Sequence, residues 1–168
     1  MDSIEYSVIV PTCGRSDLFQ KTINTLAAQT FRNFEVIVPD DTASESERTK
    51  IKKILEKFGQ KNSIKYNYIF TNSGLFQSKN TNQGLQAANG KYIRILHSDD
   101  LISPSTLMFE YNLFEKYPGK LNIIFHERMY FNNEKNLKFS ENVRASFVNP
   151  LFYFKEYLSW RTAIPSCT

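Results

Sequence analysis

The sequence predicts an α/β fold in which helices cover both faces of a mainly parallel, Rossmann-like sheet. Short apolar runs alternate with segments whose apolar residues recur at helical spacing, as far as about residue 117. The first run, at 6–10, is continuously apolar, which is typical of a strand buried on both faces of a parallel sheet, whereas 64–70 alternates. Polar clusters directly follow several of these runs. We therefore expect repeated strand–helix units joined by right-handed crossovers.

Start and stop signals place the individual elements. Ser16 is a suitable N-cap for the first helix, and Ser44 or Ser46 for the second, which Gly59 is expected to end. Ser103-Pro104 predicts an N-cap followed by proline at the first helical position. The predicted strands are 6–10, 34–38, 64–70 and 92–96, and the predicted helices are 16–29, 44–59, 73–88 and 103–117.

The pattern is less regular after residue 117. We expect a fifth strand at 121–125, a polar loop at 132–142 and an aromatic-rich helix at 150–160, all within a single domain spanning 1–168. Core packing is the default role of the late aromatic side chains, and an exposed stripe would instead favour self-association or peripheral membrane contact. These residues are Phe147, Leu151, Phe152, Phe154, Tyr157, Leu158 and Trp160.

Composition narrows the class of protein. With 168 residues, 41% hydrophobic and 23% charged, the chain suits one globular domain, and 14 Phe and 9 Tyr argue against disorder. The net charge of +4 comes without any basic run, so we expect no nucleic-acid partner. Two distant cysteines, an acidic start and no apolar run of membrane-spanning length predict a cytoplasmic protein, at most docked on a membrane surface.

Three strand ends carry the polar groups that could perform chemistry: 12–15, 40–41 and 97–100. Ligands of open parallel sheets bind beyond the carboxyl ends of the strands, so these clusters should meet at one edge. Aspartate oxygens are hard ligands suited to Mg²⁺ or Mn²⁺, which commonly bind through one or two carboxylates plus substrate phosphates. The alternative is that the aspartates only cap helices or shape turns.

Two stretches, SVIVPTCGR at 7–15 and LAAQTFRNFEVIV at 26–38, closely resemble the opening of family-2 glycosyltransferases. That opening has an apolar strand, Pro-Thr, a helix closing on Gln-Thr, and a second strand ending in Asp-Asp. The similarity continues through 84–93 and LHSDD at 96–100, so it covers about residues 7–107. It implies a GT-A fold and an inverting transfer of sugar from a nucleotide diphosphate, with a divalent cation, Mn²⁺ or Mg²⁺.

The resemblance also assigns roles. Residues 11–13 would line the base and ribose pocket with Arg15 near by, and Asp41 with Asp40 would hydrogen-bond the nucleobase, usually uracil. Asp99 corresponds to the metal-binding carboxylate of the Asp-x-Asp motif, and Ser98 to its middle position near the ribose. The implied donor-site residues are Pro11, Thr12, Cys13, Arg15, Asp40, Asp41, Lys79, Asn82, Ser98 and Asp99.

Three departures from the family pattern matter. Cys13 stands where an aromatic that stacks on the base is common, and His97 replaces the first carboxylate of Asp-x-Asp. His97 could ligate the metal or only cap the strand. No general base appears in a matching context, so the catalytic residue is unassigned and expected beyond Thr168. The late acids are Glu127, Glu134, Glu141 and Glu156.

The expected function is therefore a metal-assisted glycosyltransferase acting from a UDP-sugar on a saccharide or lipid-linked acceptor, a reaction typical of bacterial polysaccharide assembly. The missing base keeps a nucleotide-sugar-binding fragment or scaffold open as the alternative. A sugar nucleotidyltransferase would need a glycine-rich loop with basic residues, and Gly14-Arg15 is a poor match. A dinucleotide oxidoreductase would need G-x-G-x-x-G after Val10, which is absent.

Overall fold

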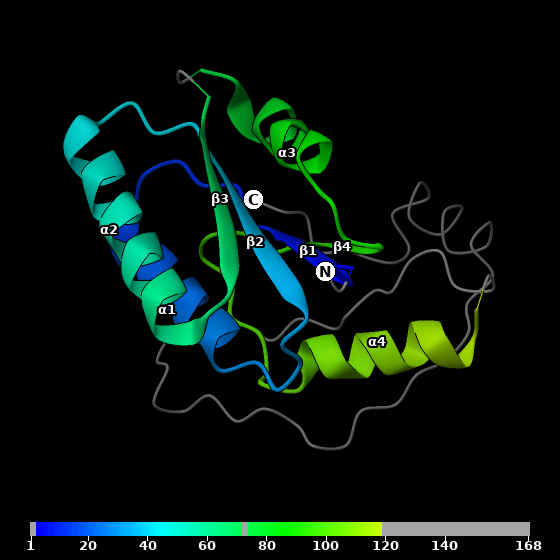
Figure 1. The fold of residues 1–168 in the computed structure, drawn as a ribbon. Coiled ribbons are helices and arrows are strands. Elements are labelled where there is room, and N and C mark those ends of the chain that lie inside the picture. Colours follow the sequence, from blue (N-terminus) through cyan, green and yellow to red (C-terminus); the bar gives the residue numbers. More distant parts are fainter. Residues whose placement is uncertain (1–2, 72–73, 119–168) are drawn as a thin grey trace, which may run out of the picture. The chain divides into compact units, whose positions relative to one another are not determined.

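A computed structural model describes residues 3–71 and 74–118. All of them belong to the first of two units, 1–122 and 123–168, into which the chain divides. Strands and helices alternate from end to end of this part (Figure 1). The elements are β1 (Tyr6–Ile9), α1 (Ser16–Ala27), β2 (Phe34–Asp40), α2 (Glu45–Asn62), β3 (Lys65–Phe70), α3 (Phe76–Gln86), β4 (Tyr92–Ile95) and α4 (Thr106–Lys116).

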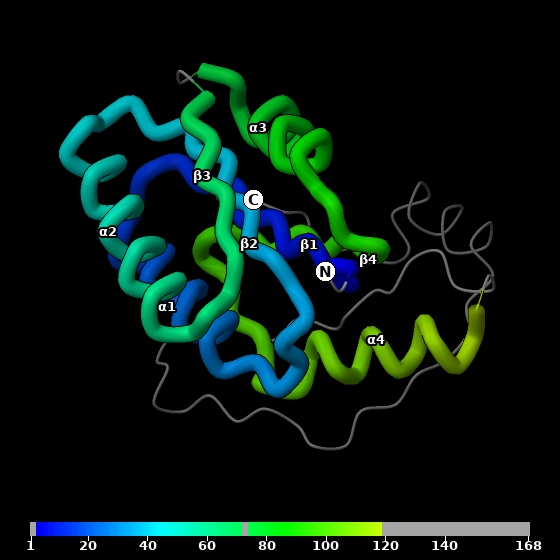
Figure 2. The backbone as a smooth tube through the Cα atoms, in the orientation of Figure 1, coloured from blue at the N-terminus to red at the C-terminus, as the bar shows by residue number. Residues whose placement is uncertain are grey.

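The four strands form one parallel sheet in the order β3-β2-β1-β4. From β1 the chain first moves outward through β2 and β3, and then returns through α3 to place β4 on the other side of β1. The path can be followed in the tube of Figure 2. The strand order therefore reverses between β1 and β4, and in sheets of this kind ligands bind at such a switch point.

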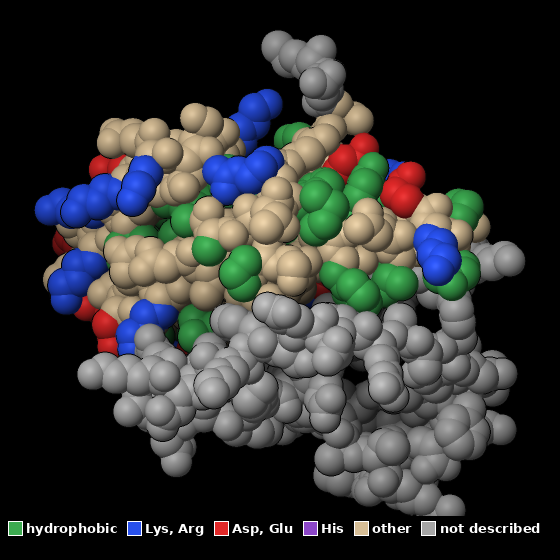
Figure 3. Space-filling view, turned by 90° about the horizontal axis from the view of Figure 1, so that it is seen from below, with side chains coloured by type: hydrophobic (Ala, Val, Ile, Leu, Met, Phe, Trp, Pro, Cys, Tyr) green, Lys and Arg blue, Asp and Glu red, His purple; other side chains and the backbone are tan. Residues whose placement is uncertain are grey.

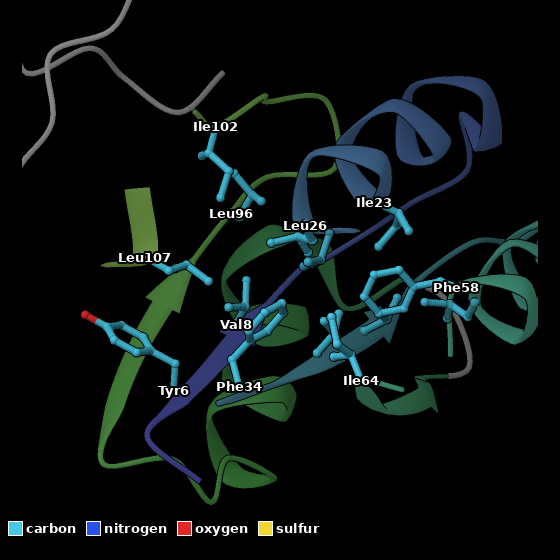
Figure 4. Close-up of a cluster of buried hydrophobic side chains, with 14 of the residues drawn as sticks. Tyr6, Val8, Ile23, Leu26, Phe34, Phe58, Ile64, Leu96, Ile102 and Leu107 are labelled. Atoms are coloured by element: carbon cyan, nitrogen blue, oxygen red, sulfur yellow. The ribbon is translucent and has the colours of Figure 1, made fainter. Parts of the chain in front are cut away.

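Alternate residues of the strands divide the core between the two faces of the sheet. Side chains such as Val8 and Val36 face α1, α2 and α4, where they join the main hydrophobic cluster (Figure 4). Phe31 and Tyr111 pack against each other with ring centroids 4.9 Å apart, so α4 is tied to the same cluster. The expected sheet with helices on both faces is thus confirmed, because α3 lies against the opposite face (Figure 1).

The face beneath α3 is closely packed and partly polar. A Cβ on Gly84 would lie 2.5 Å from Ile9 Cγ2 and 3.1 Å from Pro39 Cγ, so only glycine allows this approach of helix to sheet. Below it, the Ser7 hydroxyl donates to Glu35 Oε1 at 2.7 Å in a buried hydrogen bond. The same two side chains accept the backbone N–H of Asn89, which fixes the entry to β4.

A buried ion pair attaches α4 to β4. Arg94 Nη1 binds Glu110 Oε1, and both side chains are largely shielded from solvent. Burial lowers the pKa of Arg94 to about 10, because the charged form loses hydration. The pair lies on the α4 face of β4, since Arg94 is in register with Val8.

Several helix ends differ from the sequence-based expectations, and three of the differences have a visible physical reason. Ser16 is the first helical residue rather than the N-cap, which is Arg15 in a left-handed conformation. Gly59 lies inside α2, and Ser63 ends the helix instead. A side chain at Gly59 would collide with the Tyr66 ring, so glycine is needed here for packing. At 103–104 no helix begins: α4 starts at Thr106, two residues after Pro104, whereas Ser44 caps α2 as expected.

The expectations for 121–125, 132–142 and 150–160 lie outside the described residues, and the single domain over 1–168 stays a prediction. In the part that the structure describes, none of the helices has the length and apolar character needed to cross a membrane. Figure 3 shows hydrophobic side chains in separate small patches, with Lys and Arg gathered at the end occupied by α1 and α2. The described part of this face therefore carries hydrophobic, basic and acidic side chains side by side.

Gly90→Ala should destabilise the fold by about 2 kcal/mol, the middle of the range for overpacking a well-packed site. The added Cβ would lie 2.4 Å from Ser7 N and 2.5 Å from Tyr6 C, and backbone in a buried strand cannot move aside cheaply. Gly74→Ala is the control: its Cβ meets nothing within 4 Å, and only the positive φ of 83° opposes it, at about 1 kcal/mol. Urea denaturation should rank the variants in this order, and an unchanged Gly90→Ala midpoint would contradict the close approach.

Candidate functional site

The ends of β1 and β2 are joined by a short continuation of the parallel ladder. Thr12 pairs with Asp40 in an isolated bridge, Thr12 N donates to Pro39 O at 3.0 Å, and Asp41 N donates to Thr12 O at 2.9 Å. Gly14 N donates to the Thr42 hydroxyl at 2.5 Å. Two of the three polar clusters expected from the sequence therefore lie side by side at the carboxyl edge.

Asp40 shapes the turn after β2 from inside the protein. Its side chain is fully buried, and the two carboxylate oxygens accept from Thr42 N at 2.9 Å and from the Tyr68 hydroxyl at 2.6 Å. Burial and this hydrogen bond raise the pKa of Tyr68, which stays protonated as a donor. The Asp40 carboxylate is therefore occupied by Thr42 N and the Tyr68 hydroxyl and is buried, and its expected nucleobase contact stays a prediction.

Asp41 instead faces the start of α3. Its carboxylate accepts from Leu75 N at 3.1 Å and from Phe76 N at 3.0 Å, so it caps a helix that has no side-chain cap of its own. Each oxygen retains a second lone pair that a ligand N–H could use. The nucleobase role of Asp41 stays a prediction, and the capping role is the one that its contacts show.

Arg15 and Asp99 bring the first and last clusters together. Gly14 and Arg15 both have left-handed backbone conformations, with φ of 73° and 54°, and this turn directs the Arg15 side chain to the loop after β4. Arg15 Nη1 lies 3.0 Å from Asp99 Oδ2, and the side chains are 56% and 33% exposed. An ion pair this exposed contributes little stability, about 0–1 kcal/mol, so both charges can change partners cheaply.

The loop that carries Asp99 is held from below by α1. The Thr22 hydroxyl donates to Asp100 O at 2.9 Å, and the buried amide of Gln29 donates to Ser103 O at 2.8 Å. Gln29 Oε1 also accepts from Leu107 N, so it caps the start of α4. Sequence reasoning took Gln29 only as the end of the first helix. The feature that could have indicated a further role is its place in the Gln29-Thr30 pair, which is part of the family resemblance.

Asn80 was missed by the sequence analysis and proves to be the polar anchor of α3. Its buried Nδ2 donates to Thr12 O at 3.2 Å and to Pro39 O at 3.0 Å, and its Oδ1 accepts from the Thr71 hydroxyl. The expected residues Lys79 and Asn82 are exposed on the same helix. Helical periodicity could have found Asn80, because it shares a face with Gly84 four residues later.

The remaining expected residues divide between buried and accessible. Pro11 and Ser98 are buried, whereas Cys13 is exposed with its Sγ 3.6 Å from Asp41 O. Partial burial, followed by the charges of Asp41 and Asp40, raises the pKa of the Cys13 thiol, which is therefore not an activated nucleophile. His97 Nδ1 lies 3.4 Å from Gln77 Nε2, so the imidazole contacts α3.

The donor set at the rim suits a cation only in part. Among the described residues no group of three His, Cys, Asp or Glu side chains is placed to hold a metal ion. Asp99 offers one accessible carboxylate beside an arginine. Mg²⁺ and similar ions often take one or two protein carboxylates and complete their shell with phosphates and water, so this set fits an ion that arrives with a diphosphate.

Glu47 supports the turn that positions Arg15. Its Oε2 accepts from Ser16 N at 2.9 Å, and its Oε1 lies 2.7 Å from Lys50 Nζ. The Lys50 hydrogen bond, and then the Ser16 N–H, lower the pKa of Glu47 to about 2. The ionised carboxylate also stands at the positive N-terminal end of α1, where anions are favoured.

Asn80→Leu should cost about 2–4 kcal/mol of unfolding free energy, because the three hydrogen bonds of a buried amide are lost, each worth about 0.5–1.5 kcal/mol. Asn82→Leu on the exposed side of α3 is the matched control and should stay within about 0.5 kcal/mol of the wild type. Urea denaturation of both variants compares the two positions. Equal losses would contradict the anchoring role of Asn80.

The stabilisation from Glu47 should depend on pH. Its pKa is lowered on folding, so the contribution is present above the ordinary glutamate pKa of about 4.3 and is lost as the pH falls through about 2. Glu47→Gln should therefore be less stable than the wild type at pH 7, with the difference closing towards pH 2. Thermal unfolding across this range, with Glu56→Gln as control, measures it. A pH-independent difference would contradict the assignment.

Comparison with known proteins gives the site its context. Residues 7–168 match the sequence model of glycosyl transferase family 2. The poly(ribitol-phosphate) beta-N-acetylglucosaminyltransferase TarS of Staphylococcus aureus is 35% identical over 106 residues, which cover 62% of this chain and 18% of TarS. A GalNAc(5)-diNAcBac-PP-undecaprenol beta-1,3-glucosyltransferase of Campylobacter jejuni is 36% identical over 111 residues, covering 63% and 34%. This chain thus matches only about a fifth to a third of these relatives.

Solved structures agree in fold. TarS residues 1–349 in complex with UDP-GlcNAc superpose with a TM-score of 0.59 at 27% identity, covering 67% of this chain and 32% of that one. The mannosyltransferase PcManGT from Pyrobaculum calidifontis, solved with GDP-Man and Mn²⁺, has a TM-score of 0.60 at 19% identity and shares the fold. The matched region covers 68% of this chain and 33% of the PcManGT chain. The family match, the parallel sheet and the GT-A neighbours together show that this chain belongs to glycosyltransferase family 2.

Proposed function

We propose that this chain is the donor-binding part of a glycosyltransferase that moves a sugar from a UDP-sugar to an acceptor hydroxyl, with inversion and with the help of a divalent cation. The observation that carries the proposal is the pairing of Arg15 with Asp99 beyond the ends of β1 and β4, where the strand order reverses. The bound UDP-GlcNAc of the TarS structure supports a nucleotide-sugar donor.

The rim provides complementary groups for a nucleoside diphosphate. The Arg15 guanidinium suits phosphate oxygens, which it can bind through two parallel N–H donors. Thr12 and Asp41 stand together at the other side of β1, where a base and ribose would extend. A diphosphate between Arg15 and Asp99 would leave the nucleoside lying across the end of β1 towards β2, because β1 separates β2 from β4.

Asp99 is the residue that would hold the cation, either Mn²⁺ or Mg²⁺. Bound there, the cation would neutralise the diphosphate and favour its departure as the leaving group. For this to occur the Asp99 carboxylate must exchange Arg15 for the cation. The exposed position of the pair makes the exchange inexpensive, and the freed guanidinium then lies beside the phosphates.

The acceptor is proposed to be a hydroxyl of a saccharide or of a lipid-linked molecule, deprotonated by a carboxylate. Among the residues that the structure describes, no carboxylate is recognisable as this general base. Attack on the anomeric carbon from the face opposite the diphosphate would invert the centre, with charge developing on the sugar as the bond to the phosphate breaks. Such an enzyme would act in the cytoplasm, at the inner face of the membrane.

UDP and Mn²⁺ together should raise the melting temperature of the full chain by about 5–10 °C when both are near 100 times their dissociation constants. Asp99→Asn should abolish the part of the shift that depends on Mn²⁺, because it removes the carboxylate that would hold the cation. Thermal shift with UDP alone, Mn²⁺ alone and both separates the two contributions.

Glu56→Gln is the charge-matched control, since Glu56 is exposed on α2 away from the strand ends, and it should keep the full shift. An unchanged shift in Asp99→Asn would remove Asp99 from the site. Failure of the wild-type chain to respond to UDP with Mn²⁺ at any concentration would overturn the proposed donor.

A further inference from the structure

Phe76 is the most exposed large hydrophobic side chain in the part of the chain that the structure describes, at 82%. Single exposed apolar residues are common on protein surfaces and carry no inference by themselves. Phe76 also has a left-handed backbone conformation with φ of 57°, which bulky residues avoid. Unfavourable backbone geometry of this kind persists only where the surroundings impose it, and it clusters at ligand-binding positions.

Asp41 imposes this geometry. Its nearly buried carboxylate accepts from both Leu75 N and Phe76 N, at 3.1 and 3.0 Å, so the Phe76 backbone is bonded directly to the end of β2. Asn80, one turn further along α3, holds the helix to the carbonyls of Thr12 and Pro39. The backbone of Phe76 is therefore held beside the end of β2, while its ring stays exposed.

These hydrogen bonds place Phe76 at the rim of the proposed donor site. The next residue, Gln77, reaches His97 at the end of β4, with 3.4 Å between Nε2 and Nδ1. The first turn of α3 thus extends from the end of β2 to the end of β4, and in the sheet β1 lies between them. Any ring that occupies the end of β1 and uses a free lone pair of Asp41 lies next to Phe76.

An exposed phenyl ring offers a flat apolar face and no hydrogen bonds, so its natural partner is another flat ring. We propose that Phe76 stacks on the nucleobase of the donor nucleotide, an inference that rests on the proposed function. The stacking surface then comes from the start of α3, while the loop after β1 presents the small Cys13 at the same rim. Stacking of a base on an aromatic side chain is largely independent of base identity.

The test uses the full chain with Mn²⁺ and measures two dissociation constants by calorimetry, for UDP and for inorganic pyrophosphate. Phe76→Asn removes the ring, and asparagine tolerates the left-handed conformation, so the backbone bond to Asp41 is kept. Phe76→Tyr retains a stacking ring. Ile93→Ala is the control, because Ile93 is an exposed apolar side chain in the first half of β4, away from the rim.

Phe76→Asn should weaken UDP binding by about 5- to 150-fold, which corresponds to the roughly 1–3 kcal/mol of one base–aromatic stack. Its pyrophosphate binding should not change, and its melting temperature without ligand should be no lower than that of the wild type. Phe76→Tyr and Ile93→Ala should both bind UDP as the wild type does.

The outcomes distinguish the two proposals. Wild-type affinity of Phe76→Asn for UDP would overturn the stacking role and leave the proposed donor intact. Equal weakening of UDP and pyrophosphate would also overturn it, because the ring would then act on the phosphate side or on the fold. Failure of the wild-type chain to bind either UDP or pyrophosphate would overturn the stacking role together with the proposed function.

Discussion

The buried side chain of Asn80 joins the carboxyl ends of the two central strands, and the arrangement of the rim depends on this amide. It donates to carbonyls of Thr12 and Pro39 at the point where the regular ladder of β1 and β2 ends. Because Asn80 belongs to α3, the same bonds set the height of that helix above the sheet. Gly84 allows the helix to approach, and Asp41 then bonds to its first turn. One buried amide therefore fixes the ends of β1 and β2 and the start of α3 relative to one another.

The other half of the rim depends on α1. Gln29 follows that helix and bonds both to the loop after β4 and to the first turn of α4, so the loop that carries Asp99 is supported. Arg15 precedes the same helix, where Glu47 holds the N–H of Ser16. The charged groups of Arg15 and Asp99 are thus exposed, while the backbone on either side is held by hydrogen bonds. Such a pair can exchange partners when an anion and a cation bind.

Much of the fold was predictable because hydrophobic periodicity is local information. The apolar runs predict four strands that alternate with helices and form a parallel sheet, and the structure confirms both. Helix ends were less predictable. Gly59 resembles a stop signal in the sequence, yet it serves packing against Tyr66, a residue from the next strand. Ser103-Pro104 resembles a helix start, but that loop instead bonds to Gln29 and Thr30, which follow α1.

The sequence by itself determined the class of fold, the family resemblance, and the presence of polar residues after each of three strands. Only the tertiary structure decided what those residues do: Asp40 turns inward to Tyr68, Asp41 caps a helix, and Asp99 meets Arg15. The physical reason is that strand and helix patterns are governed by neighbours in the chain. The role of a carboxylate depends on which donors, tens of residues away, the packed elements bring within hydrogen-bonding distance and on how much water they exclude.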